Sequence, residues 1–102
     1  MEMYKDIISQ GIALMCEGGY EAAKEKFEQA IEYNPEVEEA YVHYGNACAS
    51  IQAYDEAIES FKKALIVNPE SGENLYSIAN VYLLKDEIMK AVEYYNLSLI
   101  HI

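Results

Sequence analysis

Arginine and tryptophan are absent from this chain, and basic residues are few. Seven lysines stand against 18 aspartates and glutamates, so the net charge is −11 at neutral pH. Nucleic-acid binding relies on basic side chains that neutralise phosphates, so this balance predicts that the chain has no nucleic-acid partner. An anionic membrane surface is excluded on the same electrostatic ground.

Long apolar runs are also missing. No stretch approaches the roughly 18 apolar residues that suggest a membrane span. The first residues, Met1-Glu-Met-Tyr-Lys-Asp6, include acids and lack the basic segment that opens a secretory signal. The sequence therefore predicts no membrane association and, by default, a cytoplasmic location.

Cysteine and histidine are too sparse for a metal or catalytic site. Cys16 and Cys48 do not form a Cys-X-X-Cys pair, so we expect free thiols and no metal ion. His43 lies five residues before Cys48 on one expected helix, where the two side chains face different sides. Gly18-Gly19 is too short for a phosphate loop and lacks the following lysine. We expect neither enzyme activity nor a cofactor.

The positive feature of the sequence is a repeat with a period of 34 residues. Residues 54–69 restate residues 20–35 in loosely varied form, and both segments end in Asn-Pro. A third copy begins at Ile88 and ends one residue before the expected proline. A fixed period of this length is typical of a solenoid, in which each unit packs only against its neighbours.

Apolar spacing within each unit predicts two helices. Glycine or proline follows three of them, at Gly18-Gly19, Pro35 and Pro69. Short loops make neighbouring helices antiparallel. The expected helices cover residues 4–17, 20–33, 37–51, 54–67, 72–85 and 88 to near the end.

Small residues recur where the two helices of a unit should meet. The first helices have Gly11, Gly45 and Ala79, and the second have alanines at 34-residue spacing. We expect these positions to let the helices approach closely. An aromatic residue of each second helix should then fill the space between units: Phe27, Phe61 and Tyr95. Most acids of the second helices are expected on a solvated outer face.

These residues resemble the tetratricopeptide repeat, whose outline places small and aromatic residues at set positions before a proline. The second unit matches best, through Tyr41, Tyr44-Gly45, Cys48, Tyr54, Ala57, Phe61, Ala64 and Pro69. The resemblance implies an all-α, right-handed solenoid of three helix-turn-helix repeats in one domain, at about 4–37, 38–71 and 72–102. It also implies a scaffold that binds a peptide or partner protein in a concave groove lined by the first helix of each pair.

The family's geometry assigns candidate groove residues on the first helices, and most of them are apolar or neutral. An exposed apolar patch often marks a binding surface, although Met15 and Leu83 could instead pack only against neighbouring helices. Asn46 and Asn80 are equivalent and could pair with a peptide backbone, whereas Ile12 stands at that position in the first unit. The candidate peptide-binding residues are Ile8, Ile12, Met15, Val42, His43, Asn46, Tyr76, Asn80 and Leu83.

One subclass of the family holds the C-terminal carboxylate of chaperone peptides with basic residues. The matching positions here contain no lysine or arginine, and Glu73 among them would repel a carboxylate. We therefore do not expect this chain to act as such a carboxylate clamp.

The last expected helix has no polar capping helix after it. Val92, Tyr95 and Leu99 should then face open space, which suggests either a fragment of a longer array or a homo-oligomer formed through this end. The stretch Leu97–Ile102 resembles translated sequencing-adaptor text, and we form the hypothesis that it is artefactual. The function predicted is protein–protein interaction with a partner of unknown identity; the alternative is a structural segment of a larger or self-associating assembly.

Overall fold

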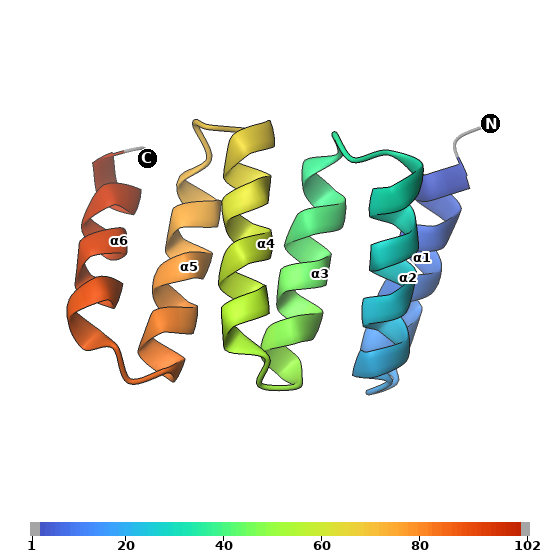
Figure 1. The fold of residues 1–102 in the computed structure, drawn as a ribbon, viewed down its shortest axis with the longest axis horizontal. Helices are drawn as coiled ribbons and strands as arrows, with labels where there is room; N and C mark the ends of the chain where they lie inside the picture. The colour runs from blue at the N-terminus through green and yellow to red at the C-terminus, as the bar shows by residue number, and fades with distance from the viewer. Residues whose placement is uncertain (1–2, 101–102) are drawn as a thin grey trace.

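Six α-helices make up the computed structural model, which describes residues 3–100 (Figure 1). No strand occurs within that range, so the predicted all-α class is confirmed. Where both ends of a helix were predicted, the observed ends agree to within one residue. The helices are α1 (Met3–Cys16), α2 (Tyr20–Tyr33), α3 (Glu38–Ser50), α4 (Tyr54–Val67), α5 (Gly72–Leu84) and α6 (Ile88–Ile100).

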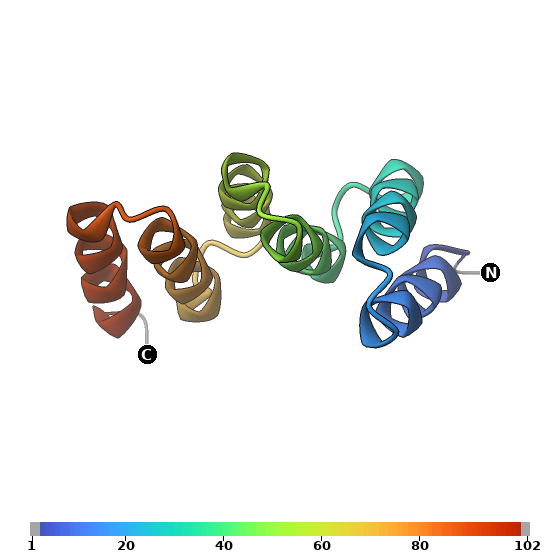
Figure 2. The same cartoon turned by 90° about the horizontal axis from the view of Figure 1, so that it is seen from below.

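The helices are arranged as three antiparallel pairs in a row. Each helix packs against the other member of its pair, and α2 and α4 also pack against the first helix of the next pair. Seen along the helices, α2 and α4 lie on one side of the row, and α1, α3 and α5 lie on the other (Figure 2). The molecule is elongated, with extents of 40 × 26 × 18 Å. Each pair therefore contacts only the pairs next to it, which is the packing pattern of a solenoid.

The turn inside each pair is the same, although its sequence is not. Gly18, Gln52 and Asp86 are 34 residues apart, and their φ values of 83°, 63° and 69° are all left-handed. Glycine adopts this conformation readily, whereas glutamine and aspartate do so at some cost. A hydrogen bond back to the preceding helix closes each turn: Gly19 N to Leu14 O (2.8 Å), Ala53 N to Cys48 O (2.8 Å) and Glu87 N to Tyr82 O (2.9 Å).

Two phenylalanines fill the space beside the glycines of their own pair, and they also pack against the next pair, as predicted. Phe27 and Phe61 are only 0% and 1% exposed. A Cβ atom added to Gly45 would lie 2.8 Å from Cζ of Phe61, and one added to Gly11 would likewise collide with the ring of Phe27. The absence of a side chain at Gly11 and Gly45 therefore lets each ring lie directly against the backbone of the facing helix.

The third pair departs from this arrangement, and the prediction for Tyr95 is wrong. Tyr95 was expected to lie in open space or between units, but its half-buried ring lies 5.4 Å from that of Tyr76 on α5. Its hydroxyl donates a hydrogen bond to Oδ1 of Asn80, 2.5 Å away. The residues at the matching positions also differ, because Ala79 stands where the other pairs have glycine and Tyr95 stands where they have phenylalanine. Val92 and Leu99, by contrast, are exposed as expected.

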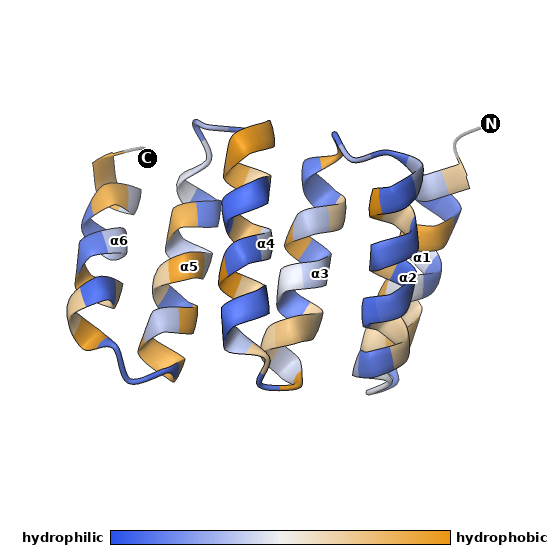
Figure 3. Cartoon of the chain, in the orientation of Figure 1, coloured by the Kyte–Doolittle hydropathy of each residue, from blue (hydrophilic) through white to orange (hydrophobic). Residues whose placement is uncertain are grey.

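Burial and polarity divide the helices by side. Hydrophilic bands run along α2 and α4 on the side seen in Figure 3, which agrees with the acid-rich outer face expected from the sequence.

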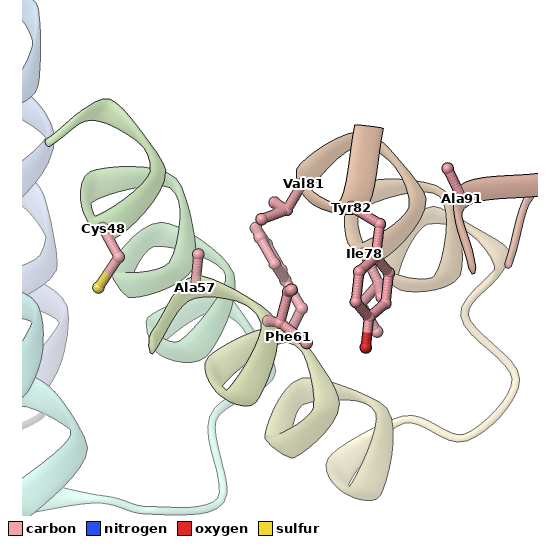
Figure 4. Close-up of a cluster of buried hydrophobic side chains, with 8 residues drawn as sticks. Cys48, Ala57, Phe61, Ile78, Val81, Tyr82 and Ala91 are labelled. Atoms are coloured by element: carbon pink, nitrogen blue, oxygen red, sulfur yellow. The ribbon is translucent and has the colours of Figure 1, made fainter. Parts of the chain in front are cut away.

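The larger buried cluster joins α3, α4, α5 and α6, and Figure 4 shows Phe61 of α4 and Val81 of α5 within it. Its buried members are Cys48, Ala57, Ile58, Phe61, Ile78, Val81, Tyr82 and Ala91.

Polar contacts fix neighbouring helices to one another at one buried and one partly buried point. The Ser60 hydroxyl donates to the backbone oxygen of Tyr41 at 2.7 Å. The Glu38 carboxylate accepts from the side-chain amides of Asn68 (3.1 Å) and Asn74 (2.8 Å). Glu38 opens α3 and Asn74 lies in α5, so this one carboxylate joins the second pair to the third.

None of the helices in residues 3–100 combines the length and apolar character needed to cross a membrane.

Candidate functional site

The predicted groove corresponds to one exposed stripe on each first helix. Residues three or four apart lie on the same side of a helix, and the non-buried residues of α3 and α5 follow that spacing. The equivalent helices α1, α3 and α5 lie on the same side of the row (Figure 2). We call their stripes together the α1/α3/α5 face: Lys5, Ile12, Met15, Cys16, Glu39, Val42, His43, Asn46, Ser50, Glu73, Tyr76, Asn80, Leu83 and Leu84.

Ile8 does not belong to this face. Its side chain is 4% exposed and packs in the cluster with Ile7, Ala23 and Phe27. The prediction of a surface role for Ile8 is corrected accordingly. The equivalent residue is half-buried in α3 (Val42) and 53% exposed in α5 (Tyr76), so exposure at this position rises from the first pair to the third.

The three equivalent central positions differ in what they offer a ligand. Ile12 is 37% exposed and Asn46 is exposed. Asn80 is half-buried, and its side-chain oxygen already accepts the hydroxyl proton of Tyr95. Its amide nitrogen therefore remains as a donor, whereas Asn46 keeps both donor and acceptor. The predicted asparagine pair is thus chemically unequal.

Three other predicted residues are only partly available. Met15 packs against the buried cluster that contains Phe27, and Val42 packs against the larger cluster that contains Phe61. The His43 ring stacks on Phe27 with centroids 5.3 Å apart, and its Nε2 lies 3.6 Å from Glu39 Oε1. Only a part of each of these three side chains is therefore exposed on the α1/α3/α5 face.

The most accessible apolar surface of the face lies on α5. Tyr76 is 53%, Leu83 49% and Leu84 60% exposed. The Tyr95 ring of α6 packs against the Tyr76 ring, a contact that the sequence did not suggest. The only sequence signal would have been the hydroxyl of Tyr95, which sets it apart from the two phenylalanines at the equivalent positions.

Charge is gathered at one end of this face. Lys5, Glu39 and Glu73 are equivalent and exposed near the start of their helices. The opposite end holds Cys16, Ser50 and Leu84. A ligand lying across the three helices therefore meets acids along one edge of α3 and α5 and apolar surface further along α5.

The two thiols lie in different environments. Cys16 is exposed, whereas Cys48 is buried. Burial raises the pKa of the Cys48 thiol to about 11, although Lys24 acts in the opposite direction. The Cys48 thiol is therefore protonated at neutral pH and is a poor nucleophile or metal ligand. In the part of the chain that is described, no group of three metal-ligating side chains is placed to hold an ion.

The sequence matches a family model described as tetratricopeptide repeat over residues 8–72, which is more than half of the chain. Among curated proteins, none matches this sequence.

Several solved structures have the same fold. The Yersinia enterocolitica type III secretion chaperone SycD, in complex with a peptide of the translocator YopD, superposes with a TM-score of 0.94 at 19% identity over 100% of this chain and 78% of its own. The second repeat domain of Spaghetti, bound to an HSP90 peptide, gives 0.88 at 17% identity over 97% and 92%. MamA gives 0.91 at 26% identity, and the chain spans 57% of its length.

Proposed function

The chain belongs to the tetratricopeptide repeat family, and from this premise we propose that it binds a peptide or helix of a partner protein on the α1/α3/α5 face. Two of the proteins that share its fold, SycD and Spaghetti, were solved with peptides bound. Neighbours of this kind support a protein-interaction module rather than a catalytic fold. We further propose that the repeats divide at about residues 37 and 71.

The observation that carries the proposal is the exposed apolar surface of α5 on this face. Tyr76 and Leu83 are each about half exposed, and they lie seven residues apart on one side of the helix. Large aromatic and aliphatic side chains left in contact with water gain most when a partner covers them. The exposed Ile12 and Asn46 extend the surface across α3 to α1.

Peptides selected from a random display library against the wild-type chain provide the test. We expect Tyr76→Ala and Leu83→Ala each to lower the affinity for the selected peptides by about tenfold or more, because each change removes exposed apolar contact area. Fluorescence anisotropy with a labelled peptide measures the loss, and circular dichroism verifies that the variants stay folded. Tyr76 and Leu83 are preferable to Val42, which packs against the core.

Matched controls are available on α2 and α4, on the opposite side of the row of helices. Tyr33 of α2 is 62% exposed and Ile66 of α4 is 78% exposed. Tyr33→Ala and Ile66→Ala remove similar side chains from the opposite side and should leave the affinity unchanged. Equal losses in both sets, or none in the first, would remove the α1/α3/α5 face from consideration.

A second candidate function is that of an assembly segment, and the outer side of α6 favours it. Val92 is 48% exposed, whereas its equivalent on α4, Ile58, is 6% exposed because α5 covers it. Leu99 is likewise 67% exposed. We propose as the alternative that another helix, from a further repeat or a second copy, covers this side.

Sedimentation equilibrium distinguishes the second-copy form of this alternative. Self-association through α6 predicts that the weight-average mass rises with concentration toward twice the 11.6 kDa of one chain. Val92→Glu should keep the mass at the single-chain value, because a buried carboxylate at the contact is costly. A wild-type chain that stays monomeric at millimolar concentration argues against self-association.

A further inference from the structure

A cleft between α2 and α4 lies on the side of the molecule opposite the α1/α3/α5 face. In Figure 1 these two helices are nearer the viewer and α3 lies behind and between them, as Figure 2 confirms. The cleft has a volume of about 240 Å³, enough for one large side chain. We call it the α2–α4 cleft, and it is lined by Glu28, Ile31, Tyr41, Tyr44, Glu56, Glu59, Ser60 and Lys63.

The hydroxyl groups of the cleft have already donated their protons to the protein. Tyr41 donates to the backbone oxygen of Pro35 at 2.7 Å, and Ser60 donates to that of Tyr41 at 2.7 Å. Tyr44 donates to Glu56 at 3.3 Å. Apart from the Lys63 ammonium, the lining therefore offers a ligand carboxylate acceptors, aromatic rings and aliphatic surface. Such a lining suits a ligand that supplies hydrogen-bond donors.

The charge of the lining is negative. Three carboxylates, Glu28, Glu56 and Glu59, face one ammonium, Lys63, which leaves an excess of two negative charges. Glu56 is paired with Lys24 at 3.2 Å, but within residues 3–100 neither Glu28 nor Glu59 forms an ion pair. The pKa of the Tyr44 phenol is raised by its burial first and then by neighbouring charges, Glu56 and Glu28 among them. An anionic ligand is therefore disfavoured in this cleft.

The geometry favours an organic cation over a metal ion. No three metal-ligating groups of the described residues converge on one point, so these carboxylates do not form an ion cage. Ile31 and the rings of Tyr41 and Tyr44 instead provide surface for methylene groups and for a cation that stacks on an aromatic face. Lys24 shows this chemistry within the chain, because its ammonium contacts Glu56 and lies 5.9 Å from the Tyr44 ring centroid.

We propose that the α2–α4 cleft receives an arginine side chain from a partner protein. A guanidinium group is planar, stacks on tyrosine rings and carries five donors that can reach carboxylates on both walls. The chain has no arginine of its own, so neither its own side chains nor a second copy can supply the group. This surface is separate from the α1/α3/α5 face, so the cleft is a second point of attachment.

The experiment compares two blocked tripeptides, acetyl-Gly-Arg-Gly-amide and its citrulline analogue, which has the same shape without the charge. Each is titrated into the full chain at about 150 mM salt while assigned tyrosine ring resonances are followed by NMR. We expect the arginine peptide to shift the rings of Tyr41 and Tyr44 in a saturable manner. The citrulline peptide should bind at least about tenfold more weakly, because it lacks the charge that the carboxylates attract.

Two double variants separate the cleft from the general attraction of an acidic protein. Glu28→Gln with Glu59→Gln should weaken the arginine peptide by about tenfold, because both unpaired carboxylates of the cleft lose their charge. Glu21→Gln with Glu25→Gln changes the net charge equally on exposed positions outside the cleft and should have little effect. Equal weakening in both double variants, equal binding of citrulline, or no response of the two rings overturns the proposal.

Discussion

Replacing Phe61 with alanine lowers the free energy of unfolding by about 3–5 kcal/mol, the usual cost of removing a fully buried phenylalanine. Phe61 is 1% exposed and is the largest fully buried side chain of the cluster that joins α3, α4 and α5. A domain of this size commonly has only about 5–10 kcal/mol of stability, so the loss is a large share of it. Thermal denaturation followed by circular dichroism should show a midpoint lowered by more than about 10 °C.

The control for this prediction lies on the same helix. Ile66 is 78% exposed, and Ile66→Ala should change the unfolding free energy by less than about 0.5 kcal/mol. A Phe61→Ala variant that is no less stable than Ile66→Ala would show that the ring does not hold the second and third pairs together.

Adding a single methyl group at Gly45 should also destabilise the chain. The new Cβ would lie 2.8 Å from Cζ of Phe61, so the ring or the helix must move. Alanine ordinarily favours a helix over glycine by about 1 kcal/mol, but overpacking of a core costs about 1–3 kcal/mol and should outweigh that gain. Urea denaturation of Gly45→Ala measures the difference.

A double-mutant cycle identifies the cause. In a Phe61→Leu background the smaller side chain leaves room, so Gly45→Ala should cost less there, with a coupling energy of about 0.5–3 kcal/mol. Asn46→Ala, at the adjacent exposed position, adds helix propensity without a collision and should not destabilise the chain. The same penalty for Gly45→Ala in both backgrounds would contradict the steric explanation.

The close approach at Gly45 is a feature that the sequence alone predicted correctly. Small residues and phenylalanines recur at a fixed spacing, and a local period is enough to place them on facing helices. The helix ranges followed for the same reason. The turns also follow the period, even though glutamine and aspartate occupy the left-handed position at Gln52 and Asp86.

What the sequence could not predict depends on contacts between units. The geometry of the family that the sequence resembles placed Ile8 on the groove surface, but its side chain is buried in the cluster formed with α2 and α3. The bridge from Glu38 to Asn68 and Asn74 spans 30 and 36 residues and has no counterpart in the period. Tyr95 is a different case, because its ring and hydroxyl contact Tyr76 and Asn80 within its own pair, where the repeat pattern placed it between units or in open space.

The α2–α4 cleft escaped the sequence in a similar way. Its acids look like ordinary members of a solvated helix face, and nothing in a linear pattern brings α2 to one wall and α4 to the other. Only the packing of α2 and α4 on α3 brings Glu28 and Glu59 into the lining of one cleft. A cleft of this kind depends on the angle between successive pairs.

The pattern of contacts between neighbours has a mechanical consequence. The molecule is 40 Å long but only 18 Å thick, and the junctions between pairs are formed mainly by α2 on α3 and by α4 on α5. Small rotations at the α2–α3 and α4–α5 junctions therefore add up to a larger change in the curvature of the whole molecule. A partner that draws α2 and α4 together on one side would open the other side, so that tension on one surface sets the curvature of the opposite one.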